Sequence, residues 1–121
     1  MDKKVQLALE RDQTVDITTT GRRSGKPRRI EIWIHYLDGH LYLTGSPGQR
    51  DWYANLQAHP HFTLHLKRSV RADLAATARP IGDRQARREI LSTILRGLGR
   101  SKDLDSWVAR SPLVEVSLGA R

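Results

Sequence analysis

Residues 18–44 read TTTGRRSGKPRRIEIWIHYLDGHLYLT, and the order of features in this stretch decides the fold class. The threonines at its start are β-branched and favour an extended strand that begins at about Thr14. From Arg28 to Leu37, isoleucines alternate with polar or aromatic residues, a period of two that predicts a strand with one apolar face. Asp38-Gly39 then indicates a tight turn into a third strand, His40 to Thr44. The second and third strands are therefore predicted to be antiparallel neighbours.

The glycine turn inside this stretch excludes one common nucleotide-binding architecture. A glycine-rich turn that binds a dinucleotide opens a helix in a parallel sheet. Gly21 and Gly25 do not open a helix, because Pro27 and the isoleucine alternation follow at once. The sequence therefore does not predict a parallel nucleotide-binding sheet.

Segments on both sides of the stretch predict further helices and strands by their apolar periodicity. Helices are expected over Lys4–Arg11, Trp52–Ala58, Arg84–Leu98 with Asp83 as its N-cap and arginines opposite its apolar face, and Leu104–Ala109. Further strands are expected over Phe62–Lys67, Val70–Ala78 and Pro112–Leu118, the first two as another hairpin. The predicted class is α+β, with about six mainly antiparallel strands, two to four helices, and a strongly curved sheet or small barrel.

The length and composition indicate a single folded domain and exclude several kinds of site. The 121 residues fit a single domain, 1–121, that can bury a substantial core. The chain has no cysteine, which excludes a disulfide framework, a thiol nucleophile and a thiolate metal site. Charges run through residues 1–11, so neither a secretory signal nor a membrane span is expected there. A cytoplasmic location is the expectation.

The net charge favours an anionic partner. There are 21 Lys and Arg against 13 Asp and Glu, a formal charge of +8, which suits nucleic acid, a phosphorylated cofactor or a membrane surface. The excess has a focus, because five cations fall within eight residues around the two glycines. They are Arg22, Arg23, Lys26, Arg28 and Arg29. Their donors neutralise phosphate or carboxylate oxygens, although a solvated hairpin with surface charge is the alternative interpretation.

Other candidate ligand contacts come from a second loop and the helix after it. Ser46, Pro47 and Gly48 form a loop whose hydroxyl and backbone N–H groups could face a ligand, or which is only a connection. Trp52 and Tyr53 suit either stacking on a planar cofactor or the core, and only one is expected to face the site.

The sequence predicts neither a metal site nor a catalytic side chain. His59, His61 and His65 have no carboxylate or cysteine at ligand spacing, and the last two are expected on the solvent face of a strand. No hydrolase motif or Ser, His and Asp arrangement is recognisable. An enzyme that has neither a metal site nor a catalytic nucleophile usually leaves the difficult chemistry to a cofactor. Redox catalysis fits that description.

These motifs together resemble a known family. Thr18–Arg28, Asp38-Gly39, Gly45-Ser46, Trp52–Leu56 and Pro60 occur in the order found in the deazaflavin-dependent nitroreductase family, and the resemblance runs from Val15 to Thr77 and resumes weakly at Ser106-Trp107. It implies a split β-barrel, often a homodimer. It also implies an oxidoreductase that transfers hydride from reduced deazaflavin coenzyme F-420 to a quinone, a nitroaromatic or another small acceptor.

The resemblance also implies roles for particular residues. Arg23 and Arg28 match positions that contact the phosphate and acidic tail of the coenzyme, Ser46 matches a serine near the deazaflavin ring, and Trp52 matches a pocket tryptophan. The expected cofactor-binding residues are Arg22, Arg23, Ser24, Lys26, Arg28, Ser46, Gly48, Arg50 and Trp52. Pro47 replaces a lysine that is common in the family, and Arg50 is a candidate to supply that charge. Tyrosines that line the acceptor site of some members are absent, with Ser101 and Leu104 in that region, so the acceptor is left open.

Three alternatives stay open at this point. The cofactor could be FMN in place of the deazaflavin. Related split barrels carry FMN, haem or fatty acyl ligands, so a carrier without catalysis is a competitor. A basic hairpin with Trp33, Tyr36 and Tyr42 nearby could instead bind single-stranded nucleic acid, which is the least favoured because no stacking motif is recognisable.

Overall fold

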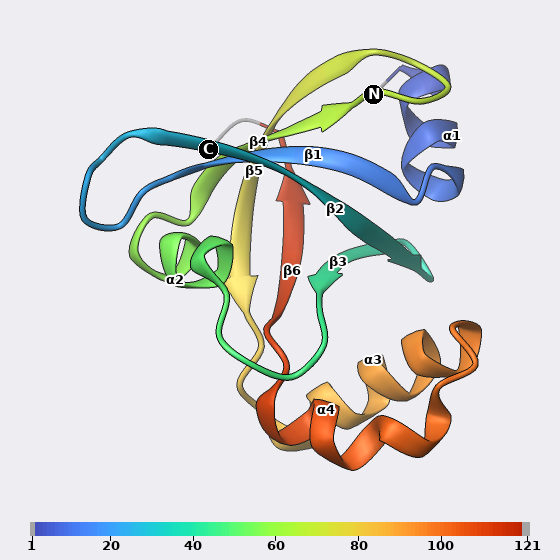
Figure 1. Cartoon of the computed structure of the whole chain (residues 1–121). Coiled ribbons are helices and arrows are strands. Elements are labelled where there is room, and N and C mark those ends of the chain that lie inside the picture. Colours follow the sequence, from blue (N-terminus) through green and yellow to red (C-terminus); the bar gives the residue numbers. More distant parts are fainter. Residues whose placement is uncertain (1, 120–121) are drawn as a thin grey trace.

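The computed structural model describes residues 2–119, so residue 1 and residues 120–121 of the expected 1–121 domain lie outside the described residues. Its elements are α1 (Lys3–Arg11), β1 (Thr14–Thr20), β2 (Pro27–Leu37), β3 (His40–Thr44), α2 (Asp51–Ala58), β4 (His61–Leu66), β5 (Ala72–Pro80), α3 (Arg84–Gly97), η1 (Ser101–Asp103), α4 (Leu104–Arg110) and β6 (Leu113–Leu118) (Figure 1). Every predicted element is present with bounds that differ by at most two residues, and only the short 3-10 helix η1 was not predicted. No helix within residues 2–119 is both long and apolar enough to cross a membrane.

The strands close into a barrel in the order β1-β2-β3-β6-β5-β4, and neighbouring strands are antiparallel. The predicted hairpins are confirmed for β2 with β3 and for β4 with β5. Asp38 and Gly39 both have positive φ, 51° and 85°, the backbone that a tight two-residue turn between twisted strands requires. The α+β class with a six-strand antiparallel barrel is therefore confirmed.

Two apolar clusters hold the barrel and its helices together. The larger one fills the barrel, where Val15, Ile17, Leu43 and Leu64 are fully buried. The second lies where α3 and α4 pack beneath the barrel in Figure 1, and it is centred on Leu91, which is also fully buried. The helices α3 and α4 thus cover one end of the barrel. The short helix α2 lies beside the β1–β2 hairpin.

The apolar face of β2 enters the core only in its second half. Ile34 is buried, whereas Ile30 on the same face is 37% exposed. The reason is that the β1–β2 hairpin continues past the barrel, as Figure 1 shows at its left. This projecting end leaves an apolar side chain beside the basic turn.

Arg87 corrects the prediction that the arginines of α3 lie opposite its apolar face. Its guanidinium is buried and donates to four backbone carbonyls, at 2.8 Å to Val108, 2.9 Å to Ile81, 3.2 Å to Trp107 and 2.6 Å to Ser111. Burial lowers the pKa of this guanidinium from its ordinary value. Because most of these carbonyls lie at or just after the end of α4, Arg87 fixes the segment that leads into β6.

Acid is expected to weaken one charge cluster on the outer face of the barrel. The Asp16 carboxylate lies 2.7 Å from Lys67 Nζ and 3.0 Å from Arg29 Nε, and Lys67, then Arg29, holds its pKa below the ordinary value against the opposing effect of burial. The stability it contributes is present above the ordinary carboxyl pKa and is lost as the pH falls through the lowered one. Unfolding by urea between pH 5 and about pH 2 should show a smaller loss of stability in Asp16→Asn than in the wild type. Equal losses in the two proteins would contradict this assignment.

Candidate functional site

The basic turn between β1 and β2 has a fixed backbone. Gly21 N–H donates to the Lys26 carbonyl at 2.8 Å, and Gly25 N–H donates to the Gly21 carbonyl at 2.9 Å. Gly25 has a φ of +70°, which L side chains rarely adopt, and a Cβ on Gly21 would lie 2.5 Å from Ser24 Oγ. The backbone conformation of the turn therefore requires glycine at position 25, and a side chain at position 21 would displace the Ser24 hydroxyl.

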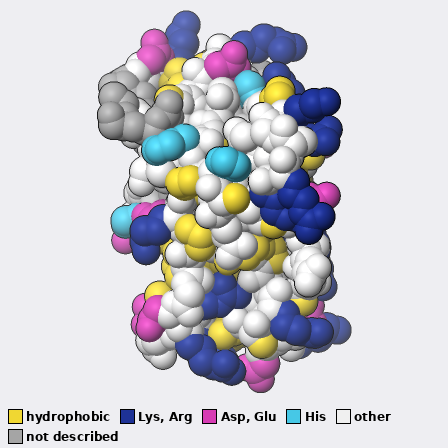
Figure 2. All heavy atoms as spheres, turned by 90° about the vertical axis from the view of Figure 1, so that its left-hand side faces the viewer, with side chains coloured by type: hydrophobic (Ala, Val, Ile, Leu, Met, Phe, Trp, Pro, Cys, Tyr) yellow, Lys and Arg dark blue, Asp and Glu magenta, His cyan; other side chains and the backbone are white. Residues whose placement is uncertain are grey.

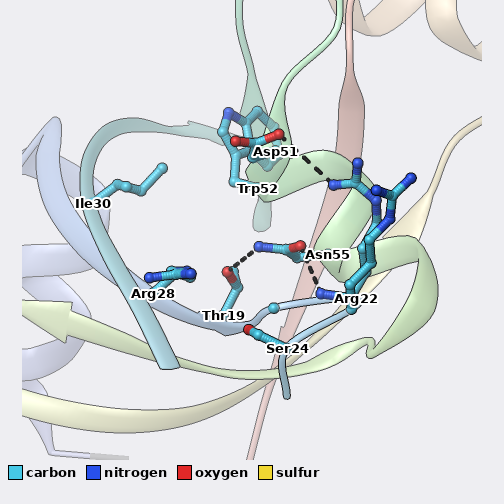
Figure 3. Close-up of a pocket in the computed structure, with 10 residues that line it drawn as sticks. Thr19, Arg22, Ser24, Arg28, Ile30, Asp51, Trp52 and Asn55 are labelled. Carbon is cyan, nitrogen blue, oxygen red and sulfur yellow. Dashed lines mark hydrogen bonds and ion pairs between the residues drawn. The ribbon is translucent and has the colours of Figure 1, made fainter. Parts of the chain in front are cut away.

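This turn forms one wall of a cavity of about 380 Å³, which we call the turn pocket. It is lined by Thr19, Gly21, Arg22, Arg23, Ser24, Arg28, Ile30, Asp51, Trp52 and Asn55. Figure 3 shows Arg28 and Ile30 on β2 facing α2, which carries Asp51, Trp52 and Asn55. The fold thus brings five of the predicted cofactor residues together: Arg22, Arg23, Ser24, Arg28 and Trp52.

Asn55 connects the two walls of the turn pocket, and the sequence analysis missed it. Its side chain is buried, its Oδ1 accepts from Arg22 N–H at 3.0 Å, and its Nδ2 donates to Thr19 Oγ1 at 3.1 Å (Figure 3). The available signal was an asparagine on the buried side of a short helix, where that residue type is unfavourable unless its amide is bonded. Asn55 positions the start of the turn against α2.

Replacing Asn55 with leucine should lower the free energy of unfolding by about 2 kcal/mol, because the Arg22 N–H and the buried Thr19 hydroxyl both lose their partner. Chemical denaturation checks this. Gln57→Leu, an exposed position on the same helix, is the matched control and should change stability by less than about 0.5 kcal/mol. Equal effects at the two positions would remove the positioning role.

The turn pocket has an excess of positive charge. Arg22 Nη1 lies 3.7 Å from Asp51 Oδ1, and the carboxylate is 97% exposed, so the pair is weak. Within the described part of the chain, the Arg23 and Arg28 side chains have no hydrogen bond or ion pair. On the face drawn in Figure 2, Lys and Arg side chains lie along the right-hand edge and across the lower part of the molecule. Guanidinium groups with free donors beside a cavity suit a phosphate or carboxylate ligand.

Trp52 contributes to both the core and the turn pocket. It is 8% exposed and packs in the barrel cluster, yet its ring lines the pocket. Tyr53 meets it edge to face, with ring centroids 6.0 Å apart, and lines a different cavity. Of the two aromatic residues, Trp52 alone lines the turn pocket, and which of them faces a ligand stays a prediction.

A second cavity, which we call the loop pocket, adjoins the first. Its volume is about 820 Å³, and it is lined by Arg22, Gly48, Gln49, Arg50, Asp51, Tyr53, Ala54, Gln57, Arg110, Ser111 and Pro112. Arg22 and Asp51 line both cavities, so the two meet at this ion pair. The predicted residues Gly48 and Arg50 lie here, and Arg50 donates at 3.0 Å to each of the Ser46 and Gln49 carbonyls. Arg50 therefore braces the loop as well as charging the pocket.

Two predicted cofactor residues do not line either cavity. Lys26 and Ser46 are both exposed, and neither side chain reaches the turn pocket or the loop pocket. Ser46 contributes its carbonyl to Arg50, so its role beside a ring stays a prediction.

The histidines require one correction. His61 is exposed, as expected, but His65 is only 7% exposed. Its ring lies between Thr18 Oγ1 on β1 and Asp73 Oδ1 on β5, each at 2.7 Å, so side chains of the two neighbouring strands flank it. Across residues 2–119, no group of three His, Asp or Glu side chains is arranged to hold a metal ion.

Comparisons with known proteins bear on the family and the fold. Residues 2–118 match the model of a family described as F420H2-dependent quinone reductase. Among solved structures, one described as an F-420 reductase is 16% identical with a TM-score of 0.72, and the alignment covers 99% of this chain and 97% of that one. One described as an F-420-H2-dependent reductase is 22% identical with a TM-score of 0.66, covering 88% and 95%.

The same barrel occurs with another flavin ligand. An FAD-binding protein from Mesorhizobium loti is 16% identical with a TM-score of 0.63, and the alignment covers 95% of this chain and 87% of that one. At these identities the likeness to solved structures concerns the fold, whereas the family model spans nearly the whole chain.

Proposed function

Because the chain belongs to the F420H2-dependent quinone reductase family, we propose that its turn pocket binds the anionic part of coenzyme F-420. The protein is accordingly an oxidoreductase that depends on this coenzyme. The observation that carries the proposal is the pair of guanidinium groups, Arg23 and Arg28, which line the cavity without a partner among the residues described.

The turn pocket fits a phosphate-bearing tail on chemical grounds. Three arginines, Arg22, Arg23 and Arg28, line the pocket, and Asp51 is its one carboxylate. A bound anion would accept hydrogen bonds from the guanidinium N–H groups that the fold leaves free. Ser24 Oγ accepts from Lys26 N–H at 3.1 Å, which fixes the hydroxyl beside the same cavity. Binding would thus cost little reorganisation of the turn.

The planar part of the coenzyme would lie toward α2, where the turn pocket meets the loop pocket. Trp52 is held there by the core, and the backbone of the 45–50 loop is braced by Arg50. Reduced coenzyme F-420 supplies a hydride when bound. The chain has to hold the ring and the acceptor in contact, a positioning effect that needs no acidic or basic side chain.

Titration of the purified protein with F-420, FMN, haem and a single-stranded oligonucleotide tests the proposal. Fluorescence and absorbance should show saturable binding of F-420 that weakens with added salt, because charged contacts are screened. Binding of FMN or haem alone would support the carrier alternatives, and binding of the oligonucleotide alone would support a nucleic-acid module. In either case the assignment of the turn pocket to F-420 would be wrong.

A second measurement separates an enzyme from a carrier. Reduced F-420 mixed with menadione should be reoxidised faster in the presence of the protein than in its absence. We include nitroaromatics among the proposed acceptors and expect the same assay to report on them. Tight binding without acceleration for any acceptor would favour a carrier.

We also propose a homodimer in a reducing cytoplasm. Trp33 is 48% exposed on the outer face of the barrel, and tryptophan is a residue type enriched at interfaces, so we place the contact with a second copy there. The cysteine-free sequence suits a reducing compartment. Sedimentation should show a dimer for the wild type and a monomer for Trp33→Lys. A monomer for both proteins would exclude this dimer.

A further inference from the structure

The loop pocket carries positive charge beyond that of the turn pocket, in which we have proposed that the coenzyme tail lies. Arg50 and Arg110 line it, together with Arg22, which already faces Asp51. In the part of the chain that the structure describes, the Arg110 side chain makes no hydrogen bond or ion pair. The pocket therefore holds three guanidinium groups against one carboxylate.

Hydrogen bonds fix the backbone on both sides of Arg110. The Arg110 carbonyl accepts from Gly48 N–H at 3.2 Å, which ties the end of α4 to the 45–50 loop. Arg87 holds the carbonyls of Trp107, Val108 and Ser111 on either side of Arg110. The backbone that carries Arg110 is therefore already ordered, and binding of an anion would have to order only the side chain.

The rest of the lining suits a planar organic molecule. Tyr53, Ala54 and Pro112 give it apolar surface, and Gln49 and Gln57 add amide groups. A volume of about 820 Å³ lies within the range of small-molecule sites and has room for more than one ring. Because Arg22 and Asp51 line both cavities, a molecule here would lie beside one held in the turn pocket.

We propose that the loop pocket is the acceptor site and that it selects planar aromatic acceptors carrying a carboxylate or sulfonate over neutral ones. The inference rests on the proposed function, since it needs the coenzyme tail in the turn pocket. Arg110 is the specificity-determining side chain, with Arg50 adding to the local charge.

The test compares 1,4-naphthoquinone with its 2-sulfonate in steady-state reoxidation of reduced F-420. Arg110→Gln should raise KM for the sulfonate about tenfold, as expected for one charge-assisted contact, and leave KM for the neutral quinone within about twofold. The different reactivities of the two quinones cancel when each is compared between wild type and variant. Arg96→Gln removes the same charge from an exposed position on α3 outside the loop pocket and should change neither value.

Fluorescence titration of F-420 into the same variants separates this inference from the proposed function. Unchanged coenzyme affinity in Arg110→Gln, with the selective rise in KM, supports the acceptor site. A fall in coenzyme affinity would mean that the acidic tail occupies the loop pocket, and equal KM changes for both quinones would remove the charge selection. If the wild type does not bind F-420 at all, the proposed function fails first.

Discussion

Replacement of Arg87 by methionine is expected to lower the free energy of unfolding by about 3 kcal/mol or more, the largest stability effect that we predict. The methionine keeps much of the apolar stem but removes the guanidinium donors from the carbonyls of Ile81, Trp107, Val108 and Ser111. The Trp107 carbonyl still accepts from Ser111 N–H at 2.9 Å, so the loss falls mainly on the other three. A buried acceptor that loses its partner has no compensating water. Urea denaturation monitored by tryptophan fluorescence measures the change.

Two further substitutions make this result interpretable. Arg87→Lys retains the charge but cannot span four carbonyls from one ammonium group, so it should recover only part of the loss. Arg88→Met on the same helix breaks an exposed ion pair with Asp105, which contributes about 0.2–1 kcal/mol. If Arg87→Met were no worse than Arg88→Met, the bracing role of Arg87 would be excluded.

The double substitution Arg23→Gln with Arg28→Gln should weaken F-420 binding roughly 100- to 10,000-fold, the largest effect on function that we predict. Each arginine is expected to contribute one hydrogen bond to a charged group, about 1.5–3 kcal/mol, and each 1.4 kcal/mol is a factor of ten. Both side chains line the turn pocket without a partner in the described residues, so their removal should not unfold the protein. Fluorescence titration at fixed ionic strength measures the loss.

A charge-matched control is needed because the whole protein is basic. Arg68→Gln with Arg96→Gln removes two exposed cations outside the turn pocket and lowers the net charge by the same amount. Affinity in this control should fall by no more than a few-fold through long-range attraction. Equal losses in the two double variants would show that overall charge, and not the turn pocket, binds the coenzyme.

Local patterns were sufficient to predict the strands and the basic turn. The isoleucine alternation in β2 and the Asp38-Gly39 turn act over a few residues, and the structure has the hairpin that they predict. The cations of the turn also fall where the sequence concentrates them. Closure into a barrel had only indirect support, since the pairing of β1 with β4 and β3 with β6 joins segments far apart in the chain.

The site itself was predicted only in part. Arg22, Arg23, Ser24, Arg28 and Trp52 meet in the turn pocket, as their order along the chain and the family resemblance implied. Asn55 and Thr19 were not predicted. Periodicity assigns a residue to a face of its element, but it does not name the partner across the gap.

The sequence by itself therefore determined the class of fold, the hairpins and a concentrated positive charge, because these depend on neighbours in the chain. Only the tertiary structure decided which polar groups meet. Arg22 and Asn55 are 33 residues apart, and Arg87 and Ser111 are 24 apart, yet each pair is hydrogen-bonded. Such contacts depend on how the closed barrel and its helices pack, and that packing also joins the two pockets at Arg22 and Asp51.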